Sequence, residues 1–128
     1  MDAVSTEAIA LAYYEHLSNG NTAALIELFH ADAVFEHPYA PQALHGREQI
    51  LAFFREQQRM FRRMQIVPTY TFAGYPDWAV AWSARIEKHD GTQFNQSGVD
   101  VFLGRNHAIE HARVFYDPTR VDAATPTT

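Results

Sequence analysis

The sequence predicts a single α+β domain in which N-terminal helices pack against an antiparallel sheet curled around a pocket. The first half of the chain carries apolar residues at helical spacing, whereas the second half alternates apolar and polar residues. The length of 128 residues leaves room for one domain, and no internal repeat or linker divides the chain. Helices followed by a run of strands are typical of an α+β arrangement around one core.

Three helices are expected in the first half. The first carries an apolar i, i+4 stripe formed by Ile9, Tyr13 and Leu17. Gly20 suits the left-handed end of this helix, and Asn21 or Thr22 can cap the next one. The second helix carries Leu25, Leu28 and Phe29. A short strand over 33–36 and a proline-marked loop then lead to a third helix over about 47–61.

The second half is predicted to form an antiparallel meander. A strand over 64–73 comes first, and the clearest alternation of apolar and polar residues follows over 78–87. Asp90-Gly91 is a strong hairpin signal, and it leads into a strand over 92–103 and a last strand over 108–116. A long twisted sheet that curls over helices can enclose a cavity, and such cavities are common ligand sites.

The composition excludes several classes of function. The net charge is −5, and the basic cluster of Arg59, Arg62 and Arg63 is too small for the broad basic face that nucleic-acid binding needs. The chain holds no cysteine, which excludes a disulfide framework and a thiol nucleophile. No apolar run approaches the roughly 18 residues of a membrane span, and no signal-peptide pattern opens the chain. We therefore expect a soluble, cytoplasmic protein without nucleic-acid or membrane partners.

Asp100 breaks the pattern of the strand over 92–103. It shares one face of that strand with Phe94 and Phe102, and both faces are apolar near the strand's end, which indicates cover on both sides. A buried carboxylate is costly unless it is paired, hydrogen-bonded or protonated. We interpret Asp100 as a pocket residue. The alternative is a side chain that points outward into a dimer interface or binds a helix end.

Two further polar residues are candidates for the same pocket. His37 ends a strand where the chain enters a loop, and histidine exchanges protons near neutral pH without a large pKa shift. The alternative is a surface histidine at a strand end. Tyr13 lies on the apolar stripe of the first helix, where it is either a core residue or a hydrogen-bond donor, and Tyr14 competes with it.

The last strand leaves its orientation open. Ile109, His111, Arg113 and Phe115 share one face, so His111 and Arg113 either enter the pocket or lie on the surface. His107 and His111 stand too far apart on a strand to share a metal easily, and the histidines show neither HxH nor HExxH spacing. We expect no metal. No phosphate-binding loop or nucleophile elbow is visible.

Six segments of the chain carry a family resemblance. They are AYYEHLSNGN over 12–21, LIELF over 25–29, DAVFEHP over 32–38, GREQI over 46–50, GVDVF over 98–102 and FYDP over 115–118. Together they resemble the nuclear transport factor 2-like superfamily, and within it the ketosteroid isomerases and SnoaL-like polyketide cyclases. The resemblance implies one SnoaL-like domain over 8–118, with tails over 1–7 and 119–128. It also implies a cone-shaped, curved antiparallel sheet packed on three N-terminal helices, a cystatin-like α+β barrel.

The resemblance also implies roles for single residues. Tyr13 falls where the isomerases keep an oxyanion-hole tyrosine, Asp100 where they keep a hydrogen-bond-donating aspartic acid, and His37 where they keep an aspartate base. It places His111 and Arg113 on the pocket face, where the isomerases carry apolar side chains. These departures make the pocket more polar, which disfavours a steroid as the substrate. Nearby cationic groups would favour an ionised Asp100 that orients His37 or acts as an acid/base itself.

The function we expect is that of a cofactor-independent isomerase or cyclase, acting by general acid/base chemistry on a small organic molecule with a carbonyl or carboxylate. His37 would remove a proton next to the carbonyl, and Tyr13 with Asp100 or Arg113 would stabilise the enolate. Substrate contacts are expected from His111, Arg113, Phe102, Trp82 and Phe54.

Two alternatives remain at this point. One is an epoxide-hydrolase-like enzyme, in which an aspartate and an arginine activate water and epoxide. The other is a non-catalytic module that binds a small molecule or a protein partner. Val99, Val101 and Leu103 make the other face of their strand apolar, which suggests a homodimer through the sheet.

Overall fold

The structure is a computed structural model that describes residues 3–117 and 122–123. Its helices are α1 (Ala3–Asn19), α2 (Thr22–Ile26) and α3 (Gly46–Met60). Its strands are β1 (Phe29–Glu36), β2 (Leu44–His45), β3 (Arg63–Gly74), β4 (Asp77–Glu87), β5 (Gln93–Arg105), β6 (Ala108–Phe115) and β7 (Asp122–Ala123). The predicted α+β class is confirmed.

Local sequence sets the ends of the helices. Gly20 has a φ of +70°, a left-handed conformation that glycine adopts without steric cost, and α1 ends just before it. The side chain of Asn21 accepts a hydrogen bond from the backbone N–H of Ala24, which caps α2. This helix is shorter than predicted. Phe29 belongs to β1 rather than to the helix, because its side chain is fully buried in the core from that strand.

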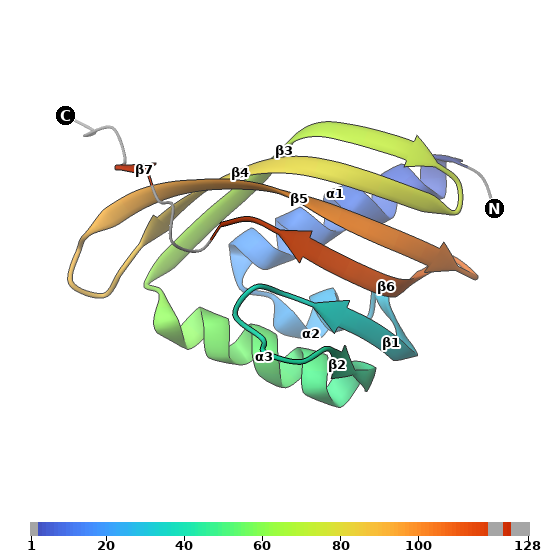
Figure 1. Ribbon diagram of the computed structural model, residues 1–128, viewed down its shortest axis with the longest axis horizontal. Helices are drawn as coiled ribbons and strands as arrows, with labels where there is room; N and C mark the ends of the chain where they lie inside the picture. The colour runs from blue at the N-terminus through green and yellow to red at the C-terminus, as the bar shows by residue number, and fades with distance from the viewer. Residues whose placement is uncertain (1–2, 118–121, 124–128) are drawn as a thin grey trace.

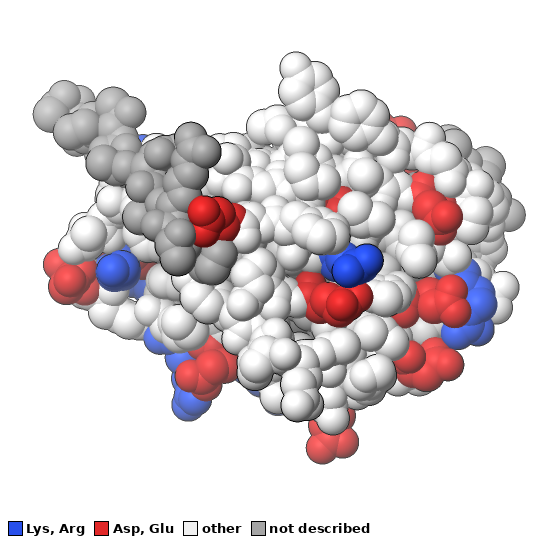
Figure 2. All heavy atoms as spheres, viewed as in Figure 1, with Lys and Arg blue, Asp and Glu red and all other residues white. Residues whose placement is uncertain are grey.

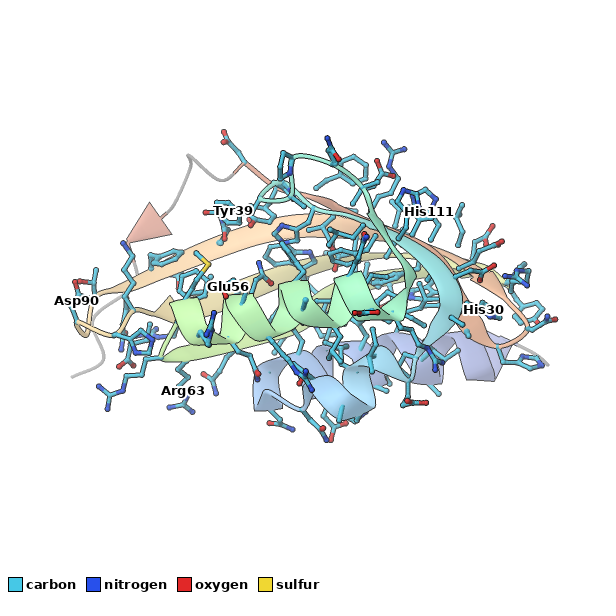
Figure 3. All side chains as sticks on the ribbon, turned by 90° about the horizontal axis from the view of Figure 1, so that it is seen from below. His30, Tyr39, Glu56, Arg63, Asp90 and His111 are labelled. Carbon is cyan, nitrogen blue, oxygen red and sulfur yellow. The ribbon has the colours of Figure 1, made fainter. Side chains whose placement is uncertain are left out.

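The strands form one curved sheet in the order β2-β1-β6-β5-β4-β3, and β7 pairs with β5. All pairs are antiparallel except β1 and β6, which run parallel. The sheet is therefore mixed rather than purely antiparallel, and within the described residues it does not close into a barrel. Figure 1 shows the long strands β3, β4 and β5 crossing in front of α1, and Figure 3 shows α1 and α3 on the same side of the curved sheet.

The inner face of the sheet, which the helices cover, carries most of the core. The predicted alternation along β4 is confirmed, because its inward side chains are all buried, namely Trp78, Val80, Trp82, Ala84 and Ile86. Residues paired across neighbouring strands share a face, and Asp100 pairs with Val80. Asp100 therefore points inward, toward the helices, among apolar side chains.

The outer face of the sheet carries an unusual number of exposed apolar side chains. We call this set the outer apolar face: Val67, Tyr70, Phe72, Val99, Leu103 and Phe115. A register shift between Pro68 and Tyr70 in β3 turns Tyr70 and Phe72 to this side. Figure 2 looks onto the sheet, and most of the surface in view is neither acidic nor basic.

The predicted domain bounds of 8–118 stay a prediction, and two elements extend into the segments expected to be tails. α1 begins at Ala3, inside the segment 1–7, and β7 lies inside the segment 119–128. The remaining residues of these two tails, 1–2, 119–121 and 124–128, lie outside the described part of the chain. Among the residues that the structure describes, none of the helices is long and apolar enough to cross a bilayer.

Candidate active site

A pocket lies between the inner face of the sheet and the helices α1 and α3. The space between its walls, with the open solvent at its mouth included, is about 570 Å³, and eighteen residues line it. Most of them are aromatic or aliphatic, and none of the described lining residues is a lysine or an arginine. Apolar walls with a few polar groups are typical of small-molecule sites. The polar groups therefore decide what this pocket can do.

Asp100 is the acidic group of the pocket. Its side chain is 2% exposed, and both carboxyl oxygens accept a hydrogen bond from a neighbouring side chain. The Tyr14 hydroxyl donates to Oδ2 at 2.6 Å, and the Trp82 indole Nε1 donates to Oδ1 at 2.9 Å. Burial raises the pKa of Asp100 to about 7, although the two hydrogen bonds pull the pKa downward. The carboxyl group is therefore poised to exchange a proton near neutral pH.

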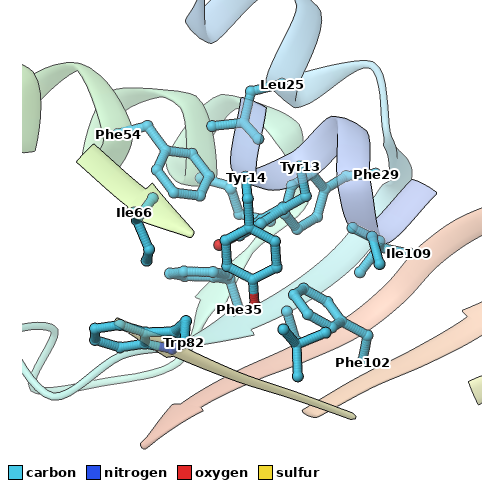
Figure 4. Packing of buried hydrophobic residues seen from close by; sticks show 14 of the residues in the cluster. Tyr13, Tyr14, Leu25, Phe29, Phe35, Phe54, Ile66, Trp82, Phe102 and Ile109 are labelled. Carbon is cyan, nitrogen blue, oxygen red and sulfur yellow. The ribbon is translucent and has the colours of Figure 1, made fainter. Parts of the chain in front are cut away.

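Tyr14, not Tyr13, supplies the hydrogen bond to Asp100. In Figure 4 the ring of Tyr14 stands between Trp82 and Phe102, and Tyr13 packs beside it at a centroid distance of 5.0 Å. Tyr13 lines the pocket wall and contacts the rings of Phe54 and Phe102 edge-on. Burial raises the pKa of both hydroxyls, so both tyrosines stay protonated. The donor role expected of Tyr13 therefore belongs to its neighbour in the sequence.

His37 follows β1 and lines the same pocket. Aromatic rings surround it, among them Phe53 at a centroid distance of 4.7 Å and Tyr116 at 5.4 Å. Burial lowers the pKa of His37 to about 4, because the apolar surroundings disfavour the charged imidazolium. His37 is therefore neutral at pH 7.

The hydrogen bonds of His37 fix the position of its proton. The backbone N–H of Tyr39 lies 3.1 Å from Nδ1, and a backbone N–H can only donate, so Nδ1 accepts. Neutral His37 then carries its proton on Nε2, which lies 3.3 Å from the side-chain amide of Gln57. The two ends of that amide are interchangeable in such an assignment, so its oxygen can receive the proton. His37 thus presents a donor, not a lone pair, through Nε2.

Asp100 does not orient His37. The partners of Asp100 are Tyr14 and Trp82, whereas those of His37 are Gln57 and the backbone of Tyr39. The two groups share the pocket wall instead. The ring of Tyr116 contacts His37 edge-on, and it also contacts Trp82, the hydrogen-bond donor of Asp100, edge-on.

His111 and Arg113 lie outside the pocket, which corrects the expectation that they face inward. They pair across the sheet with Leu103 and Val101, on the outer face. Both bind Oε2 of Glu36 there, from His111 Nε2 at 2.6 Å and from Arg113 Nε at 3.0 Å. Figure 3 shows His111 on the sheet side of the molecule, away from α1. Neither residue supplies a positive charge to the pocket.

Of the three apolar residues expected to contact the substrate, two line the pocket and one does not. Trp82 and Phe54 line the pocket, whereas Phe102 is fully buried and stacks on Trp78 at a centroid distance of 5.0 Å. Phe102 is therefore a core residue behind the wall. Within the described residues no cluster of three or more metal-ligating side chains occurs.

Several lining residues have no clear signal in the sequence. Gln57, Gln96 and Tyr116 line the pocket, and Tyr14 holds its carboxyl group. Glutamine is ordinarily a surface residue, so a single sequence gives little reason to place it inside. Only the inward face of the strand over 92–103 singles out Gln96, by the same alternation that singled out Asp100.

Helices laid across one face of a curved sheet, with a buried carboxyl group in the pocket between them, define a nuclear transport factor 2-like α+β fold. Within that superfamily the chain belongs to the SnoaL-like domain family, whose model matches residues 10–112.

Solved structures share the fold over most of the chain. SalBIII is described as an epoxide hydrolase/cyclase-like enzyme with a role in pyran ring formation in the polyether salinomycin. It is 25% identical at a TM-score of 0.83, over 96% of this chain and 98% of that one. A putative polyketide cyclase from Xanthomonas campestris is 17% identical at a TM-score of 0.82, over 90% and 92%.

A third similar structure is a hypothetical protein from Catenulispora acidiphila with a ketosteroid isomerase-like fold, in complex with trimethylamine. It is 19% identical at a TM-score of 0.80, over 87% of this chain and 86% of that one. Likeness at this level of identity establishes the fold, and the chemistry has to be argued from the residues of the pocket.

Proposed function

We propose that this SnoaL-like domain is a cofactor-independent enzyme that moves a proton on a small carbonyl-containing molecule, as an isomerase or a cyclase does. Asp100 carries the proposal. It is a buried carboxyl group in the wall of an apolar pocket, it accepts hydrogen bonds from two side chains, and its pKa is raised to about 7. A group that titrates near neutral pH can both take and return a proton during one turnover.

The roles of the two principal residues differ from those expected from the sequence. Asp100, rather than His37, is the proton acceptor, because the lone pair of neutral His37 is engaged by the Tyr39 N–H. The carbonyl oxygen of the substrate takes the place of the Gln57 amide and accepts a hydrogen bond from Nε2 of His37. Tyr14 and Trp82 are positioning residues that hold the carboxyl group of Asp100.

The reaction follows from these roles. The Asp100 carboxylate takes a proton from the carbon next to the carbonyl, and the electron pair of that C–H bond forms an enolate. His37 stabilises the enolate oxygen through the Nε2–H group that faces Gln57 in the free protein. Return of the same proton to another carbon of the conjugated system gives an isomer. Attack of the enolate carbon on a second carbonyl of the same molecule, followed by proton return to the new alkoxide, gives a ring.

A second candidate is ring formation from an epoxide, which the likeness to SalBIII favours. Asp100 would take the proton of a substrate hydroxyl as that oxygen attacks an epoxide carbon and the C–O bond of the epoxide breaks. The departing oxygen would accept a hydrogen bond from His37 and then the proton from Asp100. A version that relies on an Asp–Arg pair has no support, because Arg113 lies on the outer face.

The proposal can be tested with a simple ketone before the substrate is known. We would follow deuterium incorporation into the methyl group of 4-acetyl-4′-hydroxybiphenyl in D₂O by proton NMR. Wild type should accelerate exchange over buffer, and Asp100→Asn should lower the rate about 10²-fold, the usual scale of a general base. Asp32→Asn, an exposed surface change, is the matched control and should leave the rate unchanged.

The outcome also separates catalysis from binding. His37→Phe keeps an aromatic ring among its neighbours but removes the donor, so it should slow exchange as well. Binding of the ketone without any exchange above buffer, across several ketones and diketones, would contradict the proposal and favour a non-catalytic ligand-binding module.

We further propose that the outer apolar face pairs with a second copy of the chain. Six large apolar side chains there are between 41% and 69% exposed, and contiguous exposed patches of this kind mark interaction sites. A homodimer through the sheet would cover them and leave the pocket, on the inner face, free. A cytoplasmic location stays a prediction from the sequence.

A further inference from the structure

Gln96 is a buried amide in the pocket whose hydrogen bonding the fold leaves incomplete. The residue is 8% exposed and lines the pocket from β5, and its Nε2 has no hydrogen-bond partner among the described residues. Gln93, on the same strand, binds Arg85 through its own amide, and Gln57 lies against His37. A buried amide without a partner costs about 1–3 kcal/mol. The Nε2 group makes no hydrogen bond that stabilises the fold, which points to a role in binding a ligand.

The position of Gln96 sets it apart from Asp100 along the pocket wall. Both side chains point inward from β5, four residues apart, so their Cα atoms are roughly 13 Å apart at the usual rise of an extended strand. Gly98, between them on the same face, has no side chain, and the indole of Trp82 lies over it. Ala84, opposite Gln96, has only a methyl group. The wall between the two polar groups is therefore apolar and partly aromatic, and one elongated molecule that packs along it can reach both.

The charge of the pocket restricts that molecule further. The described lining residues include no lysine and no arginine, and burial keeps His37 neutral at pH 7 by lowering its pKa to about 4. His111 and Arg113 are bound to Glu36 on the outer face. An anionic substrate would lose its hydration without gaining a counter-charge, and it would be repelled by ionised Asp100.

Resting on the proposed function, we propose that Gln96 binds an uncharged oxygen, a carbonyl or a hydroxyl, at the end of the substrate remote from Asp100. The substrate is then an elongated, neutral oxygenated molecule and not a carboxylic acid. Rotation about the last side-chain torsion of Gln96, which has no sharply preferred value, brings its NH₂ group into the pocket. Gln96 is on this assignment a substrate-binding residue that selects for the remote oxygen.

Three rigid ketones that differ only at the end remote from the acetyl group test this assignment. They are 4-acetyl-4′-hydroxybiphenyl, the 4′-methyl compound, and the 4′-carboxylate. Titration calorimetry should show that wild type binds the hydroxyl compound about 5-fold or more tightly than the methyl compound, the effect of one hydrogen bond, and the carboxylate most weakly. In Gln96→Met, which keeps the length of the side chain, the preference for the hydroxyl compound should disappear. Gln93→Met, on the opposite face of β5, is the control and should retain it.

A second measurement needs no ligand. If the Gln96 amide is unpartnered in the free protein, Gln96→Met should raise the melting temperature of the ligand-free chain by about 3–6 °C, because it removes a buried polar group without a partner. A side chain that serves the fold would show the opposite change. Greater stability together with lost preference for the hydroxyl compound is the combination that a binding role requires.

Each contrary result overturns the proposal. These are an equal preference for the hydroxyl compound in wild type and Gln96→Met, carboxylate binding as tight as that of the hydroxyl compound, a lower melting temperature in Gln96→Met, or no binding of any of the three at 1 mM. Failure of the proposed function is seen separately. If Asp100→Asn leaves deuterium exchange unchanged while Gln96→Met abolishes the preference for the hydroxyl compound, the catalytic role of Asp100 fails and the assignment of Gln96 stands.

Discussion

The indole of Trp82 lies directly over Gly98, where a side chain would otherwise stand. A Cβ atom built on Gly98 would be 2.5 Å from Cζ2 of Trp82 and 2.5 Å from the backbone oxygen of Phe115. The two residues are paired across β4 and β5, and Asp100 follows Gly98 as the next inward residue of β5. The bare backbone at Gly98 thus lets the indole pass over the strand and donate to Asp100.

We predict that Gly98→Ala disturbs the site more than a methyl group on a strand ordinarily would. The new methyl cannot fit without a shift relative to both the indole and the backbone of β6, and such overpacking costs about 1–3 kcal/mol. Chemical denaturation should show this loss of unfolding free energy, and tryptophan fluorescence should report the displaced indole. Gly74→Ala, where a Cβ would meet nothing within 4 Å, is the matched control. Equal effects of the two substitutions would contradict the prediction.

The adjacent tyrosines of α1 provide a second prediction. Tyr14→Phe removes the 2.6 Å hydrogen bond to Asp100 and leaves a buried carboxyl oxygen without its donor, so it should lower the unfolding free energy at pH 7 by about 1–3 kcal/mol. Tyr13→Phe should cost less, because the Tyr13 hydroxyl makes no hydrogen bond to a described residue. Urea denaturation of the two variants side by side decides this, and a larger loss in Tyr13→Phe would refute it.

Loss of the Tyr14 donor should also change the titration of Asp100. This hydrogen bond lowers the pKa of Asp100 against the effect of burial, so its removal should raise that pKa above about 7. NMR of the Asp100 carboxyl carbon across pH would show the change directly. An unchanged titration would mean that the Tyr14 hydroxyl has no part in setting the proton affinity of the site.

The sequence predicts Asp100 well because its signal is local. Alternation along β5 places it on the same face as Phe102, and a carboxyl group on an apolar face is conspicuous. Tyr13 and Tyr14 could not be separated in this way. The apolar stripe of α1 favours Tyr13, but Tyr13 and Tyr14 are both buried, with 2% and 1% of their surface exposed. A wider part of the helix surface is therefore buried than the stripe indicates.

The orientation of β6 shows where alternation fails. Strict alternation puts Ile109 on the same face as His111 and Arg113, yet Ile109 is fully buried inside and the other two lie outside. The register shifts near this end of the pair, since Leu103 is opposite His111 whereas Gly104 is opposite Ile109. One extra residue on a strand moves the side chains that follow it to the opposite face of the sheet. A single sequence carries no clear mark of such a bulge, so the position of His111 and Arg113 outside the pocket followed only from the structure.

Self-association through the outer apolar face is open to a direct test. Val99→Lys places a charge in the middle strand of that face, and a charge desolvated in a dimer without a partner is strongly unfavourable. Sedimentation velocity at about 50 µM should show a dimer for wild type and a monomer for Val99→Lys. Glu7→Lys, an exposed change on α1, should remain a dimer. A wild-type monomer at that concentration would rule out the proposed interface.

The opposite pKa shifts of Asp100 and His37 predict a compensated dependence of stability on pH. Asp100 is raised from 3.8 to about 7, so between these values the folded state holds a proton that the unfolded state releases, and its contribution to stability falls as pH rises. His37 is lowered from 6.5 to about 4, so there the unfolded state holds the extra proton, and its contribution to stability falls as pH drops.

Between about pH 4 and 6.5 the two contributions change the unfolding free energy in opposite directions as the pH changes. Substitution of one residue should therefore leave the pH dependence caused by the other. Each slope approaches about 1.4 kcal/mol per pH unit for one full proton. Relative to wild type, Asp100→Asn should lose stability as pH falls from 6.5 to 4, and His37→Phe should gain stability over the same interval. Urea denaturation at half-unit steps of pH measures both differences. Differences of the same sign in the two variants, or none in either, would show that these groups keep their ordinary pKa values in the folded protein.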